Sequence, residues 1–202
     1  MNYADRNKRG AGMGIFGWVI LGAVALLLVL AIAIYNRLVR LRALAKEGFS
    51  GITVQLRRRA DLVPNLVEAV KGYATHERET LDQVTARRAE TTRTGSVEET
   101  ARADAQMTSL LGRVMVIAEA YPELKANTNF LQLQDQLANI ETELQSARRY
   151  YNATVRDLNS SIQSFPPVLI ARPLGFTEEP FYNDEDPAIQ SAPKVSFDRP
   201  AA

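Results

Sequence analysis

Residues 57–59 are three consecutive arginines, and no other residues of this chain have types and spacing better suited to chemistry. Guanidinium groups bind carboxylates and phosphates through paired hydrogen bonds. Three successive residues of a helix point to three different faces, and the spacing of the neighbouring apolar residues directs Arg59 toward the interior of a helical bundle. We expect Arg59 to form a buried or half-buried ion pair with Asp61, Glu141 or Glu143, which would fix the register between helices.

A functional alternative for the same segment is a binding site for an anion or a partner peptide. Such a site would be formed by Arg58, Arg59, Asn65 and Tyr73. We favour the register role. Replacement of Arg59 by Met separates the two readings, because a register role predicts altered melting or assembly, whereas normal folding with loss of partner binding indicates a site.

The rest of the sequence offers no catalytic or metal-binding arrangement. The chain has no cysteine, which excludes disulfides, zinc thiolates and thiol nucleophiles, and its single histidine excludes a di-metal bundle with two Glu-x-x-His pairs. We read His76, which precedes Glu77, as a polar residue on a helix surface. The 24 basic and 23 acidic residues leave a formal charge of +1, which does not favour nucleic acid. We expect no enzyme activity, cofactor, metal or nucleic-acid partner.

The run Ile15–Ile34 carries no charged side chain and predicts a membrane anchor. As a helix it is roughly 30 Å long, the thickness of a bilayer hydrocarbon core. Trp18 and Tyr35 stand near its ends, where aromatic rings favour the interface. We expect a polar tail at 1–14 and a transmembrane helix at 15–35, because the run is longer than the apolar part of a cleaved signal peptide.

Basic residues flank the anchor on both sides and favour a cytoplasmic bundle only slightly. They are Arg6, Lys8 and Arg9 before the run, and Arg37, Arg40, Arg42 and Lys46 after it.

Apolar residues at steps of three and four predict three long helices after the anchor. The first runs to about Ala89, with possible interruptions at Gly48 and Gly51 and a kink at Pro64. Ser96 and Glu99 form a capping box that starts the second helix, which should end before Pro122.

The third helix should start at Asn129 with Gln132, and its apolar seam continues to Phe165. The fold class is therefore all-α, with an N-terminal transmembrane helix followed by a long antiparallel bundle of three to four helices at 36–182. We expect residues 165–182 to dock on the bundle as an extended flap, and residues 183–202 to be disordered. The expected anchors of the flap are Leu169, Leu174, Phe176, Phe181 and Tyr182.

The membrane-proximal part of the first soluble helix, residues 38–62, lacks a partner if only the shorter second helix returns along it. Its apolar stripe would then face water and form an interface between copies of the chain, giving a homo-oligomer. The stripe consists of Leu38, Leu41, Phe49, Ile52 and Leu56.

Several separated motifs, in order, cover the chain from Tyr35 to Tyr182. They are RRRADLVPNLV at 57–67, VKGYA at 70–74, HE at 76–77, YPELKAN at 121–127, RRYYN at 148–152, FP at 165–166 and GF at 175–176. Together they resemble the LemA family. One departure is Leu158-Asn159, where the resemblance leads us to expect Tyr-Asn, so a role for a second tyrosine in that repeat is unsupported. The resemblance implies a bacterial single-pass membrane protein with a long helical bundle, a poorly defined molecular role, no enzyme activity and no known cofactor.

The sequence thus favours a non-enzymatic scaffold or adaptor in the bacterial inner membrane, in contact with the lipid bilayer and with other, unidentified membrane proteins. The alternative is a membrane-tethered module that senses a ligand or stress through an anionic molecule or peptide bound near Arg58, Arg59 and Asn65. A hydrolase has no nucleophile and base to support it.

Overall fold

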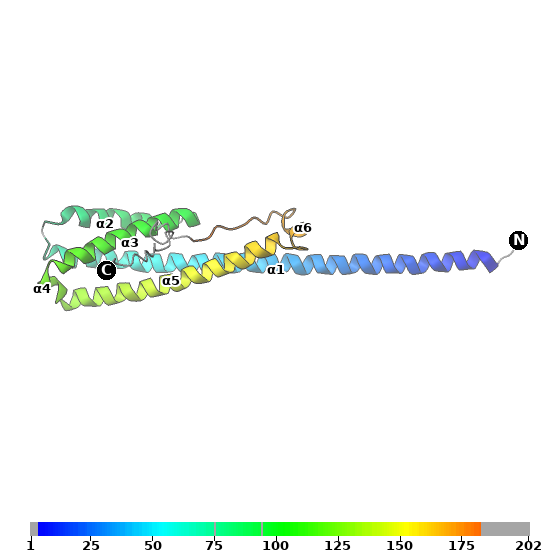
Figure 1. Cartoon of the computed structure of the whole chain (residues 1–202), viewed down its shortest axis with the longest axis horizontal. Coiled ribbons are helices and arrows are strands. Elements are labelled where there is room, and N and C mark those ends of the chain that lie inside the picture. The colour runs from blue at the N-terminus through cyan, green and yellow to red at the C-terminus, as the bar shows by residue number, and fades with distance from the viewer. Residues whose placement is uncertain (1–3, 75, 94, 183–202) are drawn as a thin grey trace, which may run out of the picture. The chain divides into compact units, whose positions relative to one another are not determined.

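The computed structural model describes residues 4–182 apart from residues 75 and 94. This part of the chain is built from helices and contains no strand (Figure 1). The helices are α1 (Ala4–Lys71), α2 (Arg78–Thr91), α3 (Val97–Glu119), α4 (Pro122–Lys125), α5 (Thr128–Gln163) and α6 (Val168–Ala171). The all-α fold expected from the sequence is confirmed, whereas the tail expected at 183–202 lies outside the described residues.

Two compact units make up the chain, and they share α1 and α5. Within the described residues we call 4–46 together with 153–179 the anchor unit, and 47–152 together with 180–182 the bundle unit.

The anchor unit contains the apolar run. The described part of α1 from Phe16 onward includes a window with a mean hydropathy of 2.8 whose residues are not buried, which makes it long and apolar enough to cross a membrane. The same helix contains the span expected at 15–35, whose bounds stay a prediction.

Helix α1 is continuous from the apolar run through Gly48, Gly51 and Pro64. Pro64 is exposed at the surface, whereas Val63 and Leu66 on either side of it are buried in the core. Tertiary packing of these neighbours therefore holds the helix where local preference would interrupt it.

The expected continuation of this helix to Ala89 is wrong. It ends at Lys71, and the amides of Tyr73 and Ala74 both donate to the carbonyl of Val70, at 3.0 and 2.9 Å. The chain then folds back as α2 (Figure 1). Leu81 and Val84 of α2 are fully buried. Their apolar spacing continues that of α1 and therefore predicts one long helix, but the two residues reach the core from a separate helix that runs in the reverse direction.

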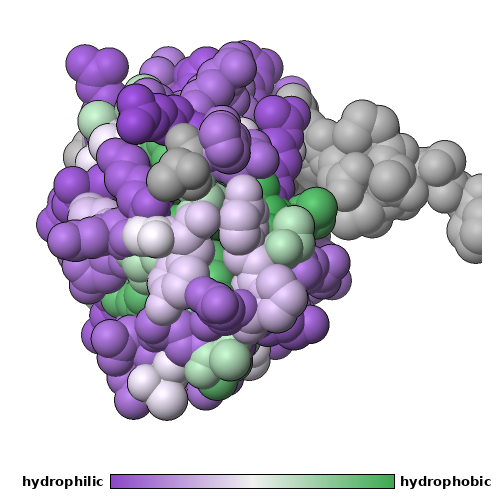
Figure 2. Space-filling view, turned by 90° about the vertical axis from the view of Figure 1, so that its left-hand side faces the viewer, coloured by the Kyte–Doolittle hydropathy of each residue, from purple (hydrophilic) through white to green (hydrophobic). Residues whose placement is uncertain are grey.

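The core of the bundle unit is one apolar cluster with members from α1, α2, α3, α4 and α5. Phe130, near the start of α5, is its largest fully buried side chain. The outer end of this unit, with α4 and the turn after α1, shows mainly hydrophilic side chains (Figure 2). The buried members are Val63, Leu66, Val67, Val70, Ala74, Leu81, Val84, Met107, Leu110, Leu111, Val114, Ala118, Leu124 and Phe130.

Two caps set the starts of the long helices. The predicted capping box of α3 is present, since the Glu99 amide donates to Ser96 Oγ at 3.2 Å and the Ser96 amide donates to Glu99 Oε2 at 2.9 Å. For α5 the predicted start at Asn129 is wrong. Asn127, not Asn129, caps this end, because its Oδ1 accepts from the amides of Asn129 and Phe130 at 2.9 and 3.2 Å.

The premise that the stripe at 38–62 lacks a partner is wrong. Leu38, Ile52 and Leu56 are buried within the single chain, with 1%, 0% and 2% of their surface exposed, and Leu41 and Phe49 are partly buried. The reason is the length of α5, whose 36 residues return much farther than α3. In the bundle unit the ring centroids of Phe49 and Tyr151 are 5.8 Å apart. A homo-oligomer would therefore need a different surface.

Gly48 marks a close approach of α1 to α5. A Cβ atom at Gly48 would lie 3.0 Å from the Cα of Tyr151, whereas a Cβ at Gly112 of α3 would meet nothing within 4 Å. We predict that Gly48→Ala lowers stability by roughly 1–3 kcal/mol through overpacking. Gly112→Ala should raise it by about 0.5–1 kcal/mol through helix propensity. Thermal unfolding of the detergent-solubilised chain, followed by circular dichroism, measures both, and equal stabilisation by the two variants would contradict the close approach.

Candidate functional site

A buried carboxylate lies at the centre of the polar interior of the bundle unit. Asp104 of α3 has none of its surface exposed. Its Oδ1 accepts a hydrogen bond from Arg59 Nη1 at 2.9 Å, and its Oδ2 accepts from the Tyr182 hydroxyl at 2.6 Å and from Arg148 Nη2. One carboxylate thus joins α1, α3, α5 and the extended segment that ends at Tyr182. We call Asp104, Arg59, Arg148 and Tyr182 the Asp104 cluster.

Helical spacing explains why these polar groups point inward. Asp104 is three residues before Met107 on the buried stripe of α3, and Arg148 is four residues after Leu144 on the seam of α5. Arg59 follows the buried Leu56 by three residues on α1. Residues three and four apart share one helix face, so each polar residue occupies a position that the apolar pattern assigns to the core.

Further contacts satisfy the cluster. Arg59 Nη2 donates to Thr108 Oγ1 at 2.8 Å, and Thr108 Oγ1 donates to the Asp104 carbonyl at 2.9 Å. Glu141 Oε2 lies 3.5 Å from Arg59 Nη1. The Arg148 guanidinium stands 5.4 Å from the centroid of the Tyr182 ring, a cation–π distance. With Glu141 beside the cluster, two carboxylates therefore lie near the two guanidinium groups, so that the charges nearly balance.

The extended segment before residue 183 is held by side-chain amides. In the bundle unit the amide of Asn152 pairs with the backbone of Tyr182: it donates to the carbonyl at 3.0 Å and accepts from the N–H at 2.8 Å. The Tyr151 hydroxyl donates to the Pro180 carbonyl at 2.8 Å. In the anchor unit Asn159 pairs in the same way with the backbone of Glu179, at 2.8 and 2.9 Å.

Only part of the flap expected at 165–182 is buried. Phe176 and Tyr182 are 7% and 3% exposed, whereas the other three expected anchors are exposed to solvent. These three are Leu169, Leu174 and Phe181.

The sequence-predicted interaction residues do not gather in one place. Arg59 is buried in the Asp104 cluster, whereas Arg58 is exposed. Asp61 is exposed and lies 3.5 Å from Arg88 of α2, not beside Arg59. Asn65 lines a shallow groove with residues of α5 that does not include the others. The Tyr73 hydroxyl accepts a hydrogen bond from Asn127 at 3.1 Å.

Of the partners named for Arg59, Glu141 is within ion-pair distance, but the main partner is Asp104, which sequence reasoning missed. Extending the α3 stripe backward from Met107 by three residues reaches Asp104, so the signal was present.

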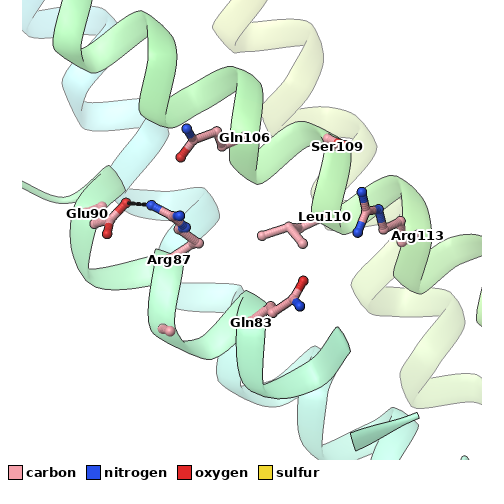
Figure 3. A pocket seen from close by; sticks show the side chains of 8 residues that line it. Gln83, Arg87, Glu90, Gln106, Ser109, Leu110 and Arg113 are labelled. Atoms are coloured by element: carbon pink, nitrogen blue, oxygen red, sulfur yellow. Dashed lines mark hydrogen bonds and ion pairs between the residues drawn. The ribbon is translucent and has the colours of Figure 1, made fainter. Parts of the chain in front are cut away.

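In the bundle unit a groove with a volume of about 730 Å³ lies between α2 and α3 (Figure 3). Arg87 and Gln83 approach it from α2, and Gln106, Leu110 and Arg113 from α3. An adjoining groove of about 460 Å³ shares Arg87, Glu90 and Gln106 with it. We call the two together the α2–α3 groove.

Neither the groove nor the cluster has the composition of a catalytic or metal centre. Among the described residues, no three His, Asp or Glu side chains are grouped so that they could hold a metal ion. His76 is exposed. The Asp104 carboxylate is enclosed, with both oxygens accepting hydrogen bonds, so it is not accessible to a substrate. This arrangement can fix helices in register, because the charged groups of the cluster bind one another.

Comparison with known sequences assigns the family. A sequence model described as the LemA family matches residues 48–197, well over half of the chain. The chain belongs to the LemA family. This assignment agrees with the resemblance of the motifs, and the matched range contains α2, α3, α4 and all four residues of the Asp104 cluster.

Two curated proteins are similar to this LemA-family chain. One is "Protein LemA" of Metamycoplasma hominis, 28% identical over 132 residues, which cover 64% of this chain and 60% of that protein. The other is "Magnetosome protein MamQ" of Magnetospirillum gryphiswaldense, 23% identical over 177 residues, which cover 75% of this chain and 65% of that protein. The chain thus spans less than two thirds of the length of these relatives.

The Asp104 cluster yields a stability prediction. Asp104→Asn removes the negative charge and leaves the Arg59 and Arg148 guanidinium groups in the interior without their main counterion. We expect a loss of about 3–5 kcal/mol in the free energy of unfolding. Asp135→Asn, at an exposed carboxylate of α5, should change it by less than about 0.5 kcal/mol. Adding Arg59→Met to Asp104→Asn should cost less than the sum of the single changes. Additive losses in urea titrations would show that the two residues are not coupled.

A second prediction concerns the tyrosine that ties the extended segment to α3. Tyr182→Phe removes one donor to the buried Asp104 carboxylate and should cost roughly 1.5–3 kcal/mol. Tyr150→Phe provides the matched control, because that ring is 47% exposed, and it should have almost no effect. Limited proteolysis should also cut near residue 182 faster in Tyr182→Phe. Unchanged stability and cleavage would mean that the hydroxyl does not hold the segment.

Proposed function

We propose that this protein is a non-enzymatic scaffold or adaptor, anchored by one span in the bacterial inner membrane with its bundle on the cytoplasmic side. The observation that carries the proposal is the continuity of α1. The same helix provides the apolar run from Phe16 and, farther along, the core residues Val63 and Leu66. One helix that contributes both to an anchor and to a folded core suits a protein whose task is to hold a surface at a membrane.

The Asp104 cluster supports a structural role for the interior. A buried charge that is fully hydrogen-bonded is inaccessible to ligands and costs much to disturb. Because Arg59 is committed to Asp104, it is not available to an anion from outside. This favours the register role over the sensing module expected at Arg58, Arg59 and Asn65, since these residues also fail to share a groove.

The α2–α3 groove is the surface that we assign to partner binding. Four arginines line it, Arg87, Arg93, Arg102 and Arg113, against the two carboxylates of Glu90 and Glu99. Arg87 already pairs with Glu90, and Glu99 is engaged in the capping box of α3. The excess of positive charge, to which Arg93 and Arg113 contribute, suits a segment of a partner protein that carries Asp and Glu side chains, because complementary charge speeds and orients association.

This proposal predicts which variants lose contact with partner proteins in cells. Proximity labelling with the full chain should mark a reproducible set of proteins. Arg93→Glu with Arg113→Glu should reduce that set at least about tenfold for groove-dependent partners, because two like-charge contacts replace two attractive ones. Arg57→Glu with Arg149→Glu, at exposed arginines of α1 and α5, is the matched control and should leave it unchanged.

An identical set of neighbours for both double variants would remove the groove from the proposal. A ligand that raises the melting temperature of the wild-type chain, but not of Arg58→Ala with Asn65→Ala, would instead favour the sensing module.

A further inference from the structure

The segment that follows α5, residues 164–176, exposes three large apolar side chains close together in sequence. Phe165, Leu169 and Leu174 are 79%, 64% and 56% exposed. Among the described residues outside the apolar run, only Val116 is exposed to a comparable degree, at 68%. Apolar residues gathered in this way on a protein surface usually mark a contact with another molecule or with a membrane.

The anchor unit places this segment beside the end of the apolar run. Phe176 packs edge-to-face against Tyr35 with 5.9 Å between ring centroids, and the Arg42 guanidinium stands 5.6 Å from the Phe176 ring centroid. Gly175 has a φ of +74°, the left-handed conformation that glycine adopts without strain, just before the chain inserts Phe176.

Burial along α1 shows where the packing begins. The 18-residue apolar window of α1 has no buried residues, whereas Ile34 and Leu38 are 8% and 1% exposed. Ile34 is the last residue of the apolar run Ile15–Ile34. The packed part of the anchor unit therefore starts where the apolar run ends, with no spacer between them.

Bilayer dimensions then set the depth of the segment. From Tyr35 to Arg42 a helix rises roughly 10 Å. The headgroup region on each side of the hydrocarbon core is roughly 5–8 Å thick. Phe176, which contacts both Tyr35 and Arg42, lies at headgroup level when the apolar run spans the core. Leu174 and α6 precede it by only a few residues.

The charge of this region matches a lipid surface. Residues 35–46 and 164–179 carry five basic side chains and two acidic ones. One of the acidic residues, Glu179, already lies 3.7 Å from Arg42. Arg37, Arg40 and Arg172 are exposed. Basic residues near the surface of a membrane are attracted by anionic headgroups.

We propose that residues 164–176 form a second membrane contact, in which Phe165, Leu169 and Leu174 enter the interface of the bilayer that α1 spans, and Arg37, Arg40 and Arg172 meet anionic headgroups. The inference rests on the proposed membrane anchoring of α1. Continuity with the apolar run, rather than apolar exposure alone, identifies the occupant of this surface as lipid.

The single tryptophan of the chain allows a direct test, because replacing it makes any introduced indole the only one present. The test variant is the full chain with Trp18→Phe and Leu169→Trp, and the matched control carries Trp18→Phe and Val116→Trp. Both positions are well exposed, so neither change disturbs the core. Each chain is reconstituted in vesicles of phosphatidylcholine and phosphatidylglycerol that contain a lipid spin-labelled near the headgroup.

We expect the indole at position 169 to be quenched at least about twofold more than the indole at position 116, since interfacial side chains lie within reach of such a label. Omitting phosphatidylglycerol, or adding Arg172→Glu, should weaken the quenching at position 169, because both changes remove attraction between basic side chains and anionic headgroups.

The wild-type chain separates the two proposals. If Trp18 is quenched by lipids labelled in the acyl chain but the indole at position 169 behaves like the control, the second contact is wrong and the anchor stands. If Trp18 is not quenched either, the anchoring proposal itself fails. Suppose instead that emission from position 169 is blue-shifted, depends on protein concentration and is quenched by no labelled lipid. Another copy of the chain would then cover the segment, which would overturn the lipid assignment.

Discussion

The interior of the bundle unit depends on the cost of burying one carboxylate. Removing Asp104 from water is favourable only if the lone pairs of its carboxylate meet donors. These donors come from elements other than its own helix, α3. Arg59 from α1, Arg148 from α5 and the Tyr182 hydroxyl must all arrive together. An apolar core tolerates small slips between helices, whereas this cluster does not. We therefore expect it to select one register for helices whose apolar seams alone would permit several.

The need of buried polar groups for hydrogen-bond partners also explains how an extended segment can be ordered without a sheet. Each backbone N–H and C=O that leaves water needs a partner. Asn152 provides both partners for Tyr182, and Asn159 provides both for Glu179. An asparagine amide has one donor group and one acceptor, so it can replace a neighbouring strand for a single residue. The departure at Leu158 fits this arrangement, because the asparagine after it keeps the pairing without the preceding tyrosine hydroxyl.

Local chemistry made much of the fold predictable. The uncharged run and the capping box at Ser96 depend on residues close together in sequence, and they appear as expected. The seam of α5 is buried as far as Ile162, but its expected continuation to Phe165 is wrong, because α5 ends at Gln163 and Phe165 is 79% exposed. Features that depend on distant partners were missed. Leu81 and Val84 continue an apolar spacing, so the reversal after Lys71 was not visible. The burial of Leu38 and Ile52 follows from how far α5 returns, which the pattern of α1 alone does not contain. Arg59 was assigned to the interior, but Asp104 was overlooked, because a carboxylate on a stripe resembles a surface residue.

The pairing of Arg59 and Arg148 with Asp104 inside the bundle unit leaves other arginines at the surface for binding. The interior arginines are matched by carboxylates, so binding must use groups that the fold leaves at the surface. In the bundle unit these include Arg93 and Arg113 of the α2–α3 groove. In the anchor unit they are Arg37, Arg40 and Arg172 beside exposed apolar side chains. The first set lies with Glu90, Glu99 and Gln106 in a groove and suits a protein segment that carries acidic side chains. The second combines charge with exposed Phe and Leu, as an interface between water and lipid requires.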